Sequence, residues 1–493
     1  MYSTMESVDW NQIKPLESIY FEGSVVADSR KIKNGDIFIA YCGEYVDGRK
    51  FIPQAVARGA VAVIYQATSD FIAIDYGVPM YAVENLPRLA GIITSHLLHN
   101  ISSNIKVLGV TGTNGKTSIT QWLAQALDKL GEKSAVIGTN GNGFWHTLEK
   151  STHTTPDAVS VQNLIKSYVQ QKANYLSIEV SSHGIDQARV NGIEFDTVVF
   201  TNLTRDHLDY HHSFTNYFEV KKRLFYWNKL RHAVINIDDS YGQKLVAELK
   251  QNNPGLMISS YGFSDEATIY IEKANYSLEG MILTLSSPWG RVIINNSLLG
   301  AFNAQNLAAT FGILCGLGYM PDKVAGVLNQ IKPAKGRMQS IRYPDRPVVI
   351  VDYAHTPDAL QNVLQSLAVF RNKRSKSGKI WCVFGCGGDR DSGKRPLMGH
   401  IAQEYADYCV VTSDNPRNEH PEKIIQDILP VKNSVLIEVD REKAIAYAIQ
   451  NAKSEDIVLI AGKGHENYQE ISGIRHYFDD LEIAQKYLEV EKK

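Results

Sequence analysis

The chain has 493 residues, and because one hydrophobic core rarely grows beyond about 250–300 residues, we expect two or three domains. Hydrophobic residues make up 44% of the chain and charged residues 21%, a globular composition that argues against extended disorder. The 51 basic and 53 acidic residues leave a formal net charge of -2, which does not support a general nucleic-acid or polyanion binder.

Signals for membrane insertion and for disulfides are weak. The apolar stretches are short and interrupted, so no transmembrane helix is expected, and residues 1–15 lack the basic-then-apolar order of a signal peptide. The cysteines are few, odd in number and scattered, which argues against a disulfide framework or a four-cysteine zinc site. They are Cys42, Cys315, Cys382, Cys386 and Cys409. We therefore expect a soluble, cytoplasmic protein with reduced thiols.

The first segment, residues 1–104, alternates short strand-like runs with helical patterns. Strand-like runs cover 36–42, 60–65 and 80–83, and an amphipathic helical pattern follows the last of them. No phosphate loop or metal cluster is evident in this part of the sequence. By itself it predicts a small α/β binding domain.

The second segment, residues 105–335, has the pattern of a larger α/β domain. A strand at 106–110 runs into a glycine-rich turn and then a helix that starts at Lys116. Further strands are expected at 134–138, 175–180, 197–201 and 233–237, with helical stretches between several of them. Strands that alternate with helices predict a parallel sheet covered on both faces. A polar, β-leaning stretch at 268–298 is expected to interrupt or border this core, and a helix is expected at 300–317.

The third segment, residues 336–493, repeats the doubly wound α/β pattern. Strands are expected at 348–351, 380–384, 409–412, 435–439 and 457–460, with a helical stripe between the first two. Such a sheet binds ligands beyond the C-terminal ends of its strands. The fold class predicted for the whole chain is therefore α/β, with three domains.

The sharpest local motif is the run Gly112-Thr113-Asn114-Gly115-Lys116-Thr117-Ser118. It follows a predicted strand and opens a predicted helix, where backbone N–H groups and the helix N-terminus can cradle phosphates. Lys116 can reach the β- and γ-phosphates, and the Thr117 hydroxyl can ligate Mg²⁺. The strict phosphate-loop pattern has glycine where this chain has Val110, so a glycine-rich turn that binds nothing remains the alternative.

Polar side chains follow two further predicted strands. Glu179 lies at the end of one strand, where a carboxylate can complete a Mg²⁺ shell opened by Thr117, although a surface acid is the alternative. A dense polar run, 201–211, follows another strand and offers His207 as a metal or substrate ligand. An ordinary solvated loop is the competing interpretation of that run.

These three motifs in this order resemble the Mur ligase family. Other stretches extend the resemblance over almost the whole chain. They are residues 26–30, 43–48, 154–157, 217–221, Asn303 with Asn306, 336–338, 352–357, 385–391, Asp414-Asn415-Pro416-Arg417 and 462–466.

The resemblance implies an ATP-dependent amide ligase of bacterial cell-wall precursor synthesis, the one that adds meso-diaminopimelate. It would join this amino acid to the D-glutamyl γ-carboxylate of UDP-N-acetylmuramoyl-L-alanyl-D-glutamate through an acyl phosphate. The implied domains are 1–104 for the uridine nucleotide sugar, 105–335 for ATP and 336–493 for the amino acid. The expected protein is a monomer that neither binds nucleic acid nor inserts into a membrane.

The resemblance also implies residue roles. Catalytic roles fall to Lys116, Lys221 and His207, and ATP binding to Gly112, Thr113, Asn114, Gly115, Lys116, Thr117, Ser118, Asn303 and Arg337. Two Mg²⁺ sites are implied, with ligands from Thr117, Glu179, His207 and Lys221, the last carboxylated on its side-chain nitrogen. Binding of the nucleotide-sugar peptide falls to Ala27, Ser29, Glu44, Tyr45, Val46, His153, Thr154, Thr155, Ser182, Gln187 and Arg189. Binding of the amino acid falls to Arg390, Asp414, Asn415, Pro416, Arg417, Gly462 and Glu466.

Two sequence details and two alternatives accompany this interpretation. His153 stands where some relatives have asparagine, and Ala27 is small, which affects individual contacts rather than the reaction.

A folylpolyglutamate synthase would share the phosphate loop, but the nucleotide-sugar motifs and the 414–417 motif argue against it. A nucleotide switch that hydrolyses ATP without ligation would not need Lys221 beside His207.

Overall fold

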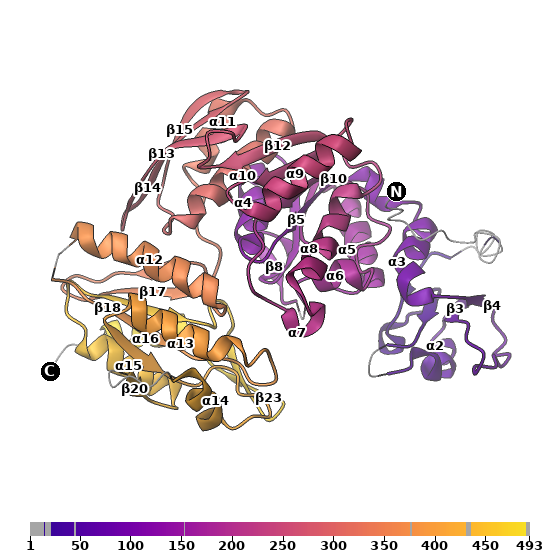
Figure 1. Ribbon diagram of the computed structural model, residues 1–493. Coiled ribbons are helices and arrows are strands. Elements are labelled where there is room, and N and C mark those ends of the chain that lie inside the picture. The colour runs from indigo at the N-terminus through magenta and orange to yellow at the C-terminus, as the bar shows by residue number, and fades with distance from the viewer. Residues whose placement is uncertain are drawn as a thin grey trace.

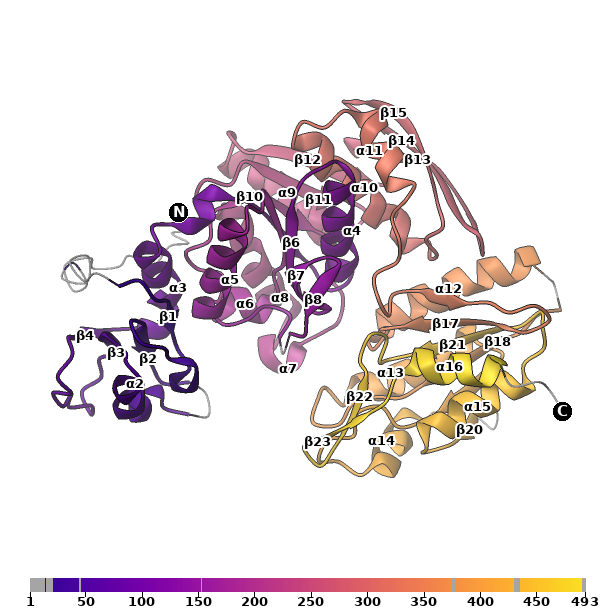
Figure 2. The ribbon, with the colours of Figure 1, turned by 180° about the vertical axis from the view of Figure 1, so that it is seen from behind.

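The computed structural model describes Lys14 and residues 21–43, 46–151, 153–374, 377–429 and 435–489. Its elements form successive α/β parts, with the N-terminal and C-terminal parts on opposite sides of the central one (Figure 1). Figure 2 shows the same order from behind, with the N-terminal sheet and the C-terminal sheet well separated. The predicted α/β class is confirmed.

The N-terminal part is a small parallel sheet. Its strands pair in the order β1 (Val25–Val26), β2 (Ile37–Ala40), β3 (Ala62–Gln66) and β4 (Met80–Val83). Helix α2 (Ile52–Ala57) packs on one face and α3 (Leu86–Leu97) on the other, because alternate strand side chains enter two separate apolar clusters. The predicted strand-like runs correspond to β2, β3 and β4.

The central part is built on one long sheet with the order β15-β14-β13-β12-β11-β10-β5-β9-β6-β7-β8. The parallel middle consists of β5 (Lys106–Thr111), β6 (Ser134–Gly138), β9 (Tyr175–Glu179), β10 (Phe195–Phe200), β11 (His232–Asn236) and β12 (Met257–Gly262). The ends consist of β7 (Gly141–Phe144), β8 (Thr147–Glu149), β13 (Ile269–Ser277), β14 (Gly280–Ser287) and β15 (Gly290–Asn296). The predicted stretch 268–298 thus borders the core as a sheet extension.

Helices cover both faces of the central sheet, as expected from the alternating pattern. One face packs against α4 (Lys116–Lys129), α10 (Phe302–Gly316) and α11 (Pro321–Leu328). The other face packs against α5 (Ala158–Gln170), α8 (Phe214–Lys222) and α9 (Ser240–Asn252). The short helices α6 (Ser182–Asp186) and α7 (Leu208–His211) follow β9 and β10.

The C-terminal part is a second doubly wound sheet, with the order β16-β17-β21-β18-β19-β20. Its strands are β16 (Gln339–Ile341), β17 (Val348–Asp352), β18 (Ile380–Phe384), β19 (Tyr408–Val411), β20 (Val435–Ile437) and β21 (Ile457–Ala461). Helices α12 (Pro357–Arg374), α13 (Lys394–Tyr405) and α14 (Pro421–Ile428) cover one face. Helices α15 (Arg441–Asn451) and α16 (Asp480–Glu489) cover the other face.

Some elements were not predicted from the sequence. The strands β7 and β8 were not predicted, because Gly141 and Gly143 weaken a strand pattern in the sequence. In the structure both glycines have positive φ angles and lie against the β8 backbone. The hairpin of β22 (Tyr468–Ile471) and β23 (Ile474–Tyr477) has mixed burial and no clean alternation. Among the described residues, no helix combines the length and apolar character that crossing a membrane requires.

A buried ion pair joins α15 to α16 and also contacts the ends of two strands of the C-terminal sheet. The Arg441 guanidinium donates two 2.8 Å hydrogen bonds to the Asp480 carboxylate, and both side chains are fully buried. The same guanidinium donates to the carbonyls of Ala461 and Ser413, at the ends of β21 and β19. These are the strand ends from which the candidate site of this domain extends.

Loss of one partner should therefore destabilise this domain. We expect Asp480→Ala to lower the free energy of unfolding by about 3–5 kcal/mol, because Arg441 would remain buried and uncompensated. Lys486→Ala removes an exposed 2.7 Å ion pair with Glu442 between the same two helices and should leave the free energy of unfolding almost unchanged, because water already solvates both charges. Urea unfolding followed by circular dichroism measures both, and equal effects would contradict this expectation.

Candidate active site

The glycine-rich loop that the sequence predicts to bind phosphate lies between β5 and α4, in the predicted strand–loop–helix arrangement. Gly112 and Gly115 both have positive φ angles, and a Cβ at Gly112 would collide with the Thr201 hydroxyl. The segment after β10 holds the loop, because the backbone N–H groups of Thr113 and Asn114 donate to Asn202 at 2.9 Å. Ser118 is buried in the first turn of α4. Loop conformation and helix start therefore match a phosphate cradle.

Two lysine side chains converge on this loop. Lys116 Nζ donates to the carbonyls of Gly112 and Thr113 at 2.8 Å, and Lys221 Nζ donates to the same Gly112 carbonyl at 3.0 Å. Lys221 comes from α8, is buried, and lies 4.5 Å above the Tyr217 ring. Burial and the Lys116 charge lower the pKa of Lys221 well below its usual value, which favours a neutral amine.

The Thr117 hydroxyl and the Glu179 carboxylate meet on the other side of the loop. Thr117 Oγ1 donates to Glu179 Oε2 at 3.0 Å, and the Thr139 backbone and hydroxyl donate to the two oxygens of the same carboxylate. Arg337 reaches across from the C-terminal part and donates to Thr117 Oγ1 at 3.1 Å. This pair of hard oxygen donors matches the ligand preference of Mg²⁺.

His207 lies near Lys116 and Lys221, but its own side-chain contacts are with Asp206 and His183. Its Nε2 is 3.2 Å from Asp206 Oδ2, and its ring centroid is 4.8 Å from that of His183. Partial loss of contact with water lowers the pKa of His207, with His183 and the two lysines acting in the same direction and Asp206 opposing them. A neutral imidazole is the form that binds a metal ion. Within the described ranges, no three His, Cys, Asp or Glu side chains converge to hold a metal.

The asparagines at the start of α10 lie beside the loop. Asn303 accepts a 2.9 Å hydrogen bond from Asn306 and donates to the Leu299 carbonyl, while Asn306 lies against Gly115. Asn114 donates at 3.0 Å to Asp358, the second residue of α12. Asp358 was not singled out from the sequence, because only the fold brings α12 to this loop.

The residues predicted for the nucleotide-sugar peptide fall into two groups. The central group surrounds β9 and α6. Hydrogen bonds in this group join Thr154 to Thr139, Thr155 to the Glu179 carbonyl, Ser182 to His211, and Arg189 to both Gln187 and the Thr155 carbonyl. His153 lies at its edge, with its backbone N–H bonded to Ser151.

The second group lies on the N-terminal part. Ser29 donates to Gln54 at 2.8 Å, Ala27 packs beside the sheet, and Val46 is exposed. Glu44 and Tyr45 lie outside the described residues. Tyr41, which the sequence analysis did not single out, lies on the N-terminal part within range of charges on the central part. Burial raises the pKa of Tyr41, and the charges of Asp157 and Arg189 from the central part also act on its hydroxyl.

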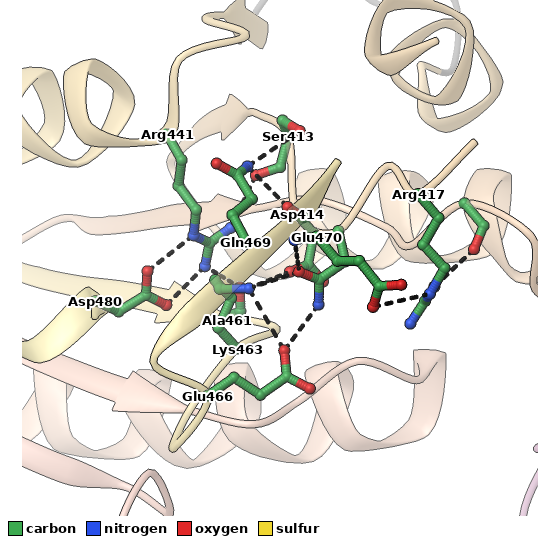
Figure 3. A network of polar contacts seen from close by, with 12 residues as sticks. Ser413, Asp414, Arg417, Arg441, Ala461, Lys463, Glu466, Gln469, Glu470 and Asp480 are labelled. Carbon is green, nitrogen blue, oxygen red and sulfur yellow. Dashed lines mark hydrogen bonds and ion pairs between the residues drawn. The ribbon is translucent and has the colours of Figure 1, made fainter. Parts of the chain in front are cut away.

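The predicted amino-acid residues gather where β19 and β21 end (Figure 3). Asn415 donates to Glu466 at 2.8 Å, and Gly462, with a φ angle of 114°, lies against the Asp414 carboxylate. The Pro416 carbonyl lies against Gly388, where only glycine leaves room. Arg390 lies on the same loop after β18 but is exposed and, in the described part of the chain, has no polar contact with this group.

Arg417 has a left-handed backbone, with a φ angle of 53°, that its surroundings hold in place. Its backbone N–H donates to the Glu470 carbonyl, and its Nη1 donates to the Gly388 carbonyl at 2.6 Å. Its Nε lies 3.9 Å from the Glu470 carboxylate. The hairpin of β22 and β23 thus orients Arg417, a support that no pattern in the sequence indicated.

Comparison with known proteins agrees with this arrangement. The chain matches the family models described as Mur ligase family, catalytic domain (residues 23–103), Mur ligase middle domain (110–314) and Mur ligase, glutamate ligase domain (336–464). It is 53% identical over 468 residues to UDP-N-acetylmuramoyl-L-alanyl-D-glutamate--2,6-diaminopimelate ligase of Neisseria meningitidis serogroup B, covering 94% of each chain.

Solved structures show the same fold. A solved structure of a UDP-N-acetylmuramoyl-L-alanyl-D-glutamate--2,6-diaminopimelate ligase has 37% identity and a TM-score of 0.68, covering 98% of this chain and 99% of that chain. MurF ligase from Thermotoga maritima in complex with ADP has 18% identity and a TM-score of 0.67, covering 94% and 98%. The chain therefore belongs to the Mur ligase family.

Proposed function

We propose that the protein is an ATP-dependent amide ligase that joins meso-diaminopimelate to UDP-N-acetylmuramoyl-L-alanyl-D-glutamate. The reaction forms the amide at the D-glutamyl γ-carboxylate and serves peptidoglycan precursor synthesis in the cytoplasm. The enzyme acts as a monomer. Residues 1–104 bind the uridine nucleotide sugar, 105–335 bind ATP and 336–493 bind the amino acid.

One contact carries the proposal: Arg337 of the C-terminal part donates to Thr117 of the phosphate loop. A ligase must bring an activated carboxylate and an amine within about 3–3.5 Å, so its phosphate site and its amino-acid site must share a border. The contact of Asn114 with Asp358 forms a second part of that border. Family membership and high identity to a ligase over 94% of the chain support the same conclusion.

The first step of the reaction requires that the negative charge of ATP be neutralised, because the attacking carboxylate is itself an anion. A γ-carboxylate oxygen attacks the γ-phosphorus of ATP, ADP leaves, and an acyl phosphate forms. Lys116 and the loop N–H groups stabilise the charge that develops on the transferred phosphoryl group. The neutral amine of the amino acid then attacks the acyl carbon, a proton leaves the nitrogen, and inorganic phosphate departs.

Two Mg²⁺ ions complete the proposed site. Thr117 and Glu179 would hold the first, and His207 with a carboxylated Lys221 would hold the second. Bound Mg²⁺ would neutralise phosphate charge near the attacking carboxylate. The low pKa of Lys221 supports carboxylation, because a neutral amine adds to CO₂ and releases a proton to give an anionic carbamate. A carbamate oxygen suits a hard cation, whereas an ammonium would repel it.

A three-substrate assay tests the proposal. Purified protein is incubated with ATP, the nucleotide-sugar dipeptide and meso-diaminopimelate, and phosphate release and product mass are followed with each component omitted in turn. A ligase needs all of them and gives a product heavier by diaminopimelate minus water. Phosphate release that is independent of both acceptor and amino acid would indicate a nucleotide switch instead.

Arg417 should decide which amino acid is added. Lysine lacks the far carboxylate of meso-diaminopimelate, so with lysine the guanidinium keeps only its contacts with the Gly388 carbonyl and the Glu470 carboxylate. We expect Arg417→Ala to lower kcat/KM for meso-diaminopimelate about 100- to 1000-fold without lowering the use of L-lysine. Arg371→Ala, which removes an ion pair with Asp407 elsewhere in the domain, serves as the control and should change neither. Equal use of lysine by the unmutated enzyme would contradict this assignment.

A further inference from the structure

Lys463 has a fully buried side chain that no step above uses. It follows β21, and its ammonium lies between the turn after β19 and the carboxylate of Glu466 (Figure 3). Nζ donates to Asn415 Oδ1 at 3.0 Å and lies 3.4 Å from both Asp414 Oδ1 and Glu466 Oε2. One cation therefore contacts three side chains of the proposed amino-acid site.

The two carboxylates beside Lys463 oppose each other electrostatically. Burial raises the pKa of Glu466, and the charge of Asp414 adds to the rise. Burial acts in the same direction on Asp414, but Lys463 and Arg441 outweigh it and lower the pKa of that carboxyl. A cation that contacts both the buried Asp414 and the half-buried Glu466 favours the state in which both carboxylates are ionised.

The contacts leave one side of Glu466 open. Its Oε2 accepts from both Asn415 Nδ2 and Lys463 Nζ, whereas its Oε1 has no hydrogen-bond partner among the described residues. The carbonyl side of Asn415 is likewise occupied, by Lys463 and by the Glu470 backbone N–H. The network thus fixes which carboxylate oxygen remains available to an amino group.

We propose that Lys463 is a positioning residue that holds Asp414 and Glu466 as an oriented pair for the reacting amino end of the incoming amino acid. This inference rests on the proposed function and adds a residue that acts through others, without touching the substrate. If the positive charge of Lys463 is removed, Asp414 and Glu466 should share one proton, and the Glu466 side chain should rotate away from its present orientation. Arg417 should be unaffected, because it serves the far end of the amino acid.

The test compares Lys463→Met with Lys463→Arg. We expect Lys463→Met to lower kcat/KM for meso-diaminopimelate about 100-fold, with KM for ATP and for the nucleotide sugar within about twofold of the parent. Lys463→Arg keeps the charge and should recover most of the loss. Lys379→Met, at an exposed lysine before β18, is the matched control and should behave as the parent.

The pH profile separates positioning from a merely structural role. Without Lys463 the carboxylate pair holds a proton to higher pH, so the acid limb of kcat/KM for meso-diaminopimelate should move upward in Lys463→Met and return in Lys463→Arg. The other charged or titratable groups that act on the pair are Arg441, His355, Tyr353 and Tyr468. These are unchanged in both variants.

Each outcome decides the matter. An unmoved acid limb, or equal rises in KM for all substrates, would overturn the positioning role even if activity falls. If Lys463→Met does not fold, Lys463→Gln, which keeps a donor and removes the charge, takes its place. If the unmutated enzyme ligates an amino acid other than meso-diaminopimelate, the variants are assayed with that amino acid. If the unmutated enzyme ligates no amino acid, both the proposed function and this inference are contradicted. If the unmutated enzyme is active and the Lys463 variants have the same kinetics, only the inference is contradicted.

Discussion

Lys116→Met should lower kcat for ligation by about 1000-fold or more, because it removes the cation that stabilises the transferred phosphoryl group. The side chain lies over the loop and donates to the Gly112 and Thr113 carbonyls, so it is placed at the phosphate cradle. Its own pKa is lowered by burial, while Glu179 and Asp206 oppose the shift. A triphosphate would add negative charge there and favour the ammonium form.

Stability should change little in this variant, since among the described residues Lys116 Nζ bonds only to two backbone carbonyls, and the Gly112 carbonyl keeps its hydrogen bond from Lys221. Lys129→Met, an exposed lysine at the last turn of the same helix, is the matched control and should keep normal turnover. Ligation rate and urea unfolding are measured for both. Near-normal turnover in Lys116→Met would remove the phosphate-loop assignment.

Lys221→Ala should also lower kcat by about 1000-fold, and a short-chain carboxylic acid or high bicarbonate should partly restore it. The physical reason is that the proposed second metal needs an anionic oxygen where the carbamate would stand. Buried position, proximity to Gly112 and a strongly lowered pKa all favour a lysine that can be carboxylated. Restoration by acetate is followed in the three-substrate assay.

Lys221→Arg supplies the discriminating control, because arginine keeps a positive charge and cannot form this carbamate. We expect it to be as inactive as Lys221→Ala. An active arginine variant would mean that the site needs a cation. A mass spectrum and ¹³C spectrum of active protein in labelled bicarbonate that show only bare lysine would also refute the carbamate.

Some of the site follows from short stretches of sequence. The run 112–118 predicts a phosphate loop because strand, glycine-rich turn and helix start are all local features. The N–H groups that would cradle a phosphate belong to that same turn. For the same reason the α/β class, the strands 106–110 and 348–351, and the motif 414–417 at a strand end could be predicted correctly.

Other parts of the site depend on residues far apart in the chain. Lys221 donates to a carbonyl 109 residues away, and Asn114 meets Asp358 across 244 residues. Periodicity and motif spacing give the type of an element but not its neighbours in a sheet. Which long-range pairs meet is set by strand order, helix packing and domain contact.

Lys463 shows this difference most clearly. In the sequence, nothing distinguishes Lys463 from the other polar residues of the 462–466 motif, and only Gly462 and Glu466 of this motif were predicted to bind the amino acid. Its significance comes from burial, since a fully buried ammonium needs the carboxylates and amide that β19 and β21 bring to it. Local sequence patterns were enough to predict the fold class and the family, and they place a candidate phosphate loop at 112–118. Which charged side chains lose contact with water together could be read only from the folded chain, because desolvation depends on everything packed around a group.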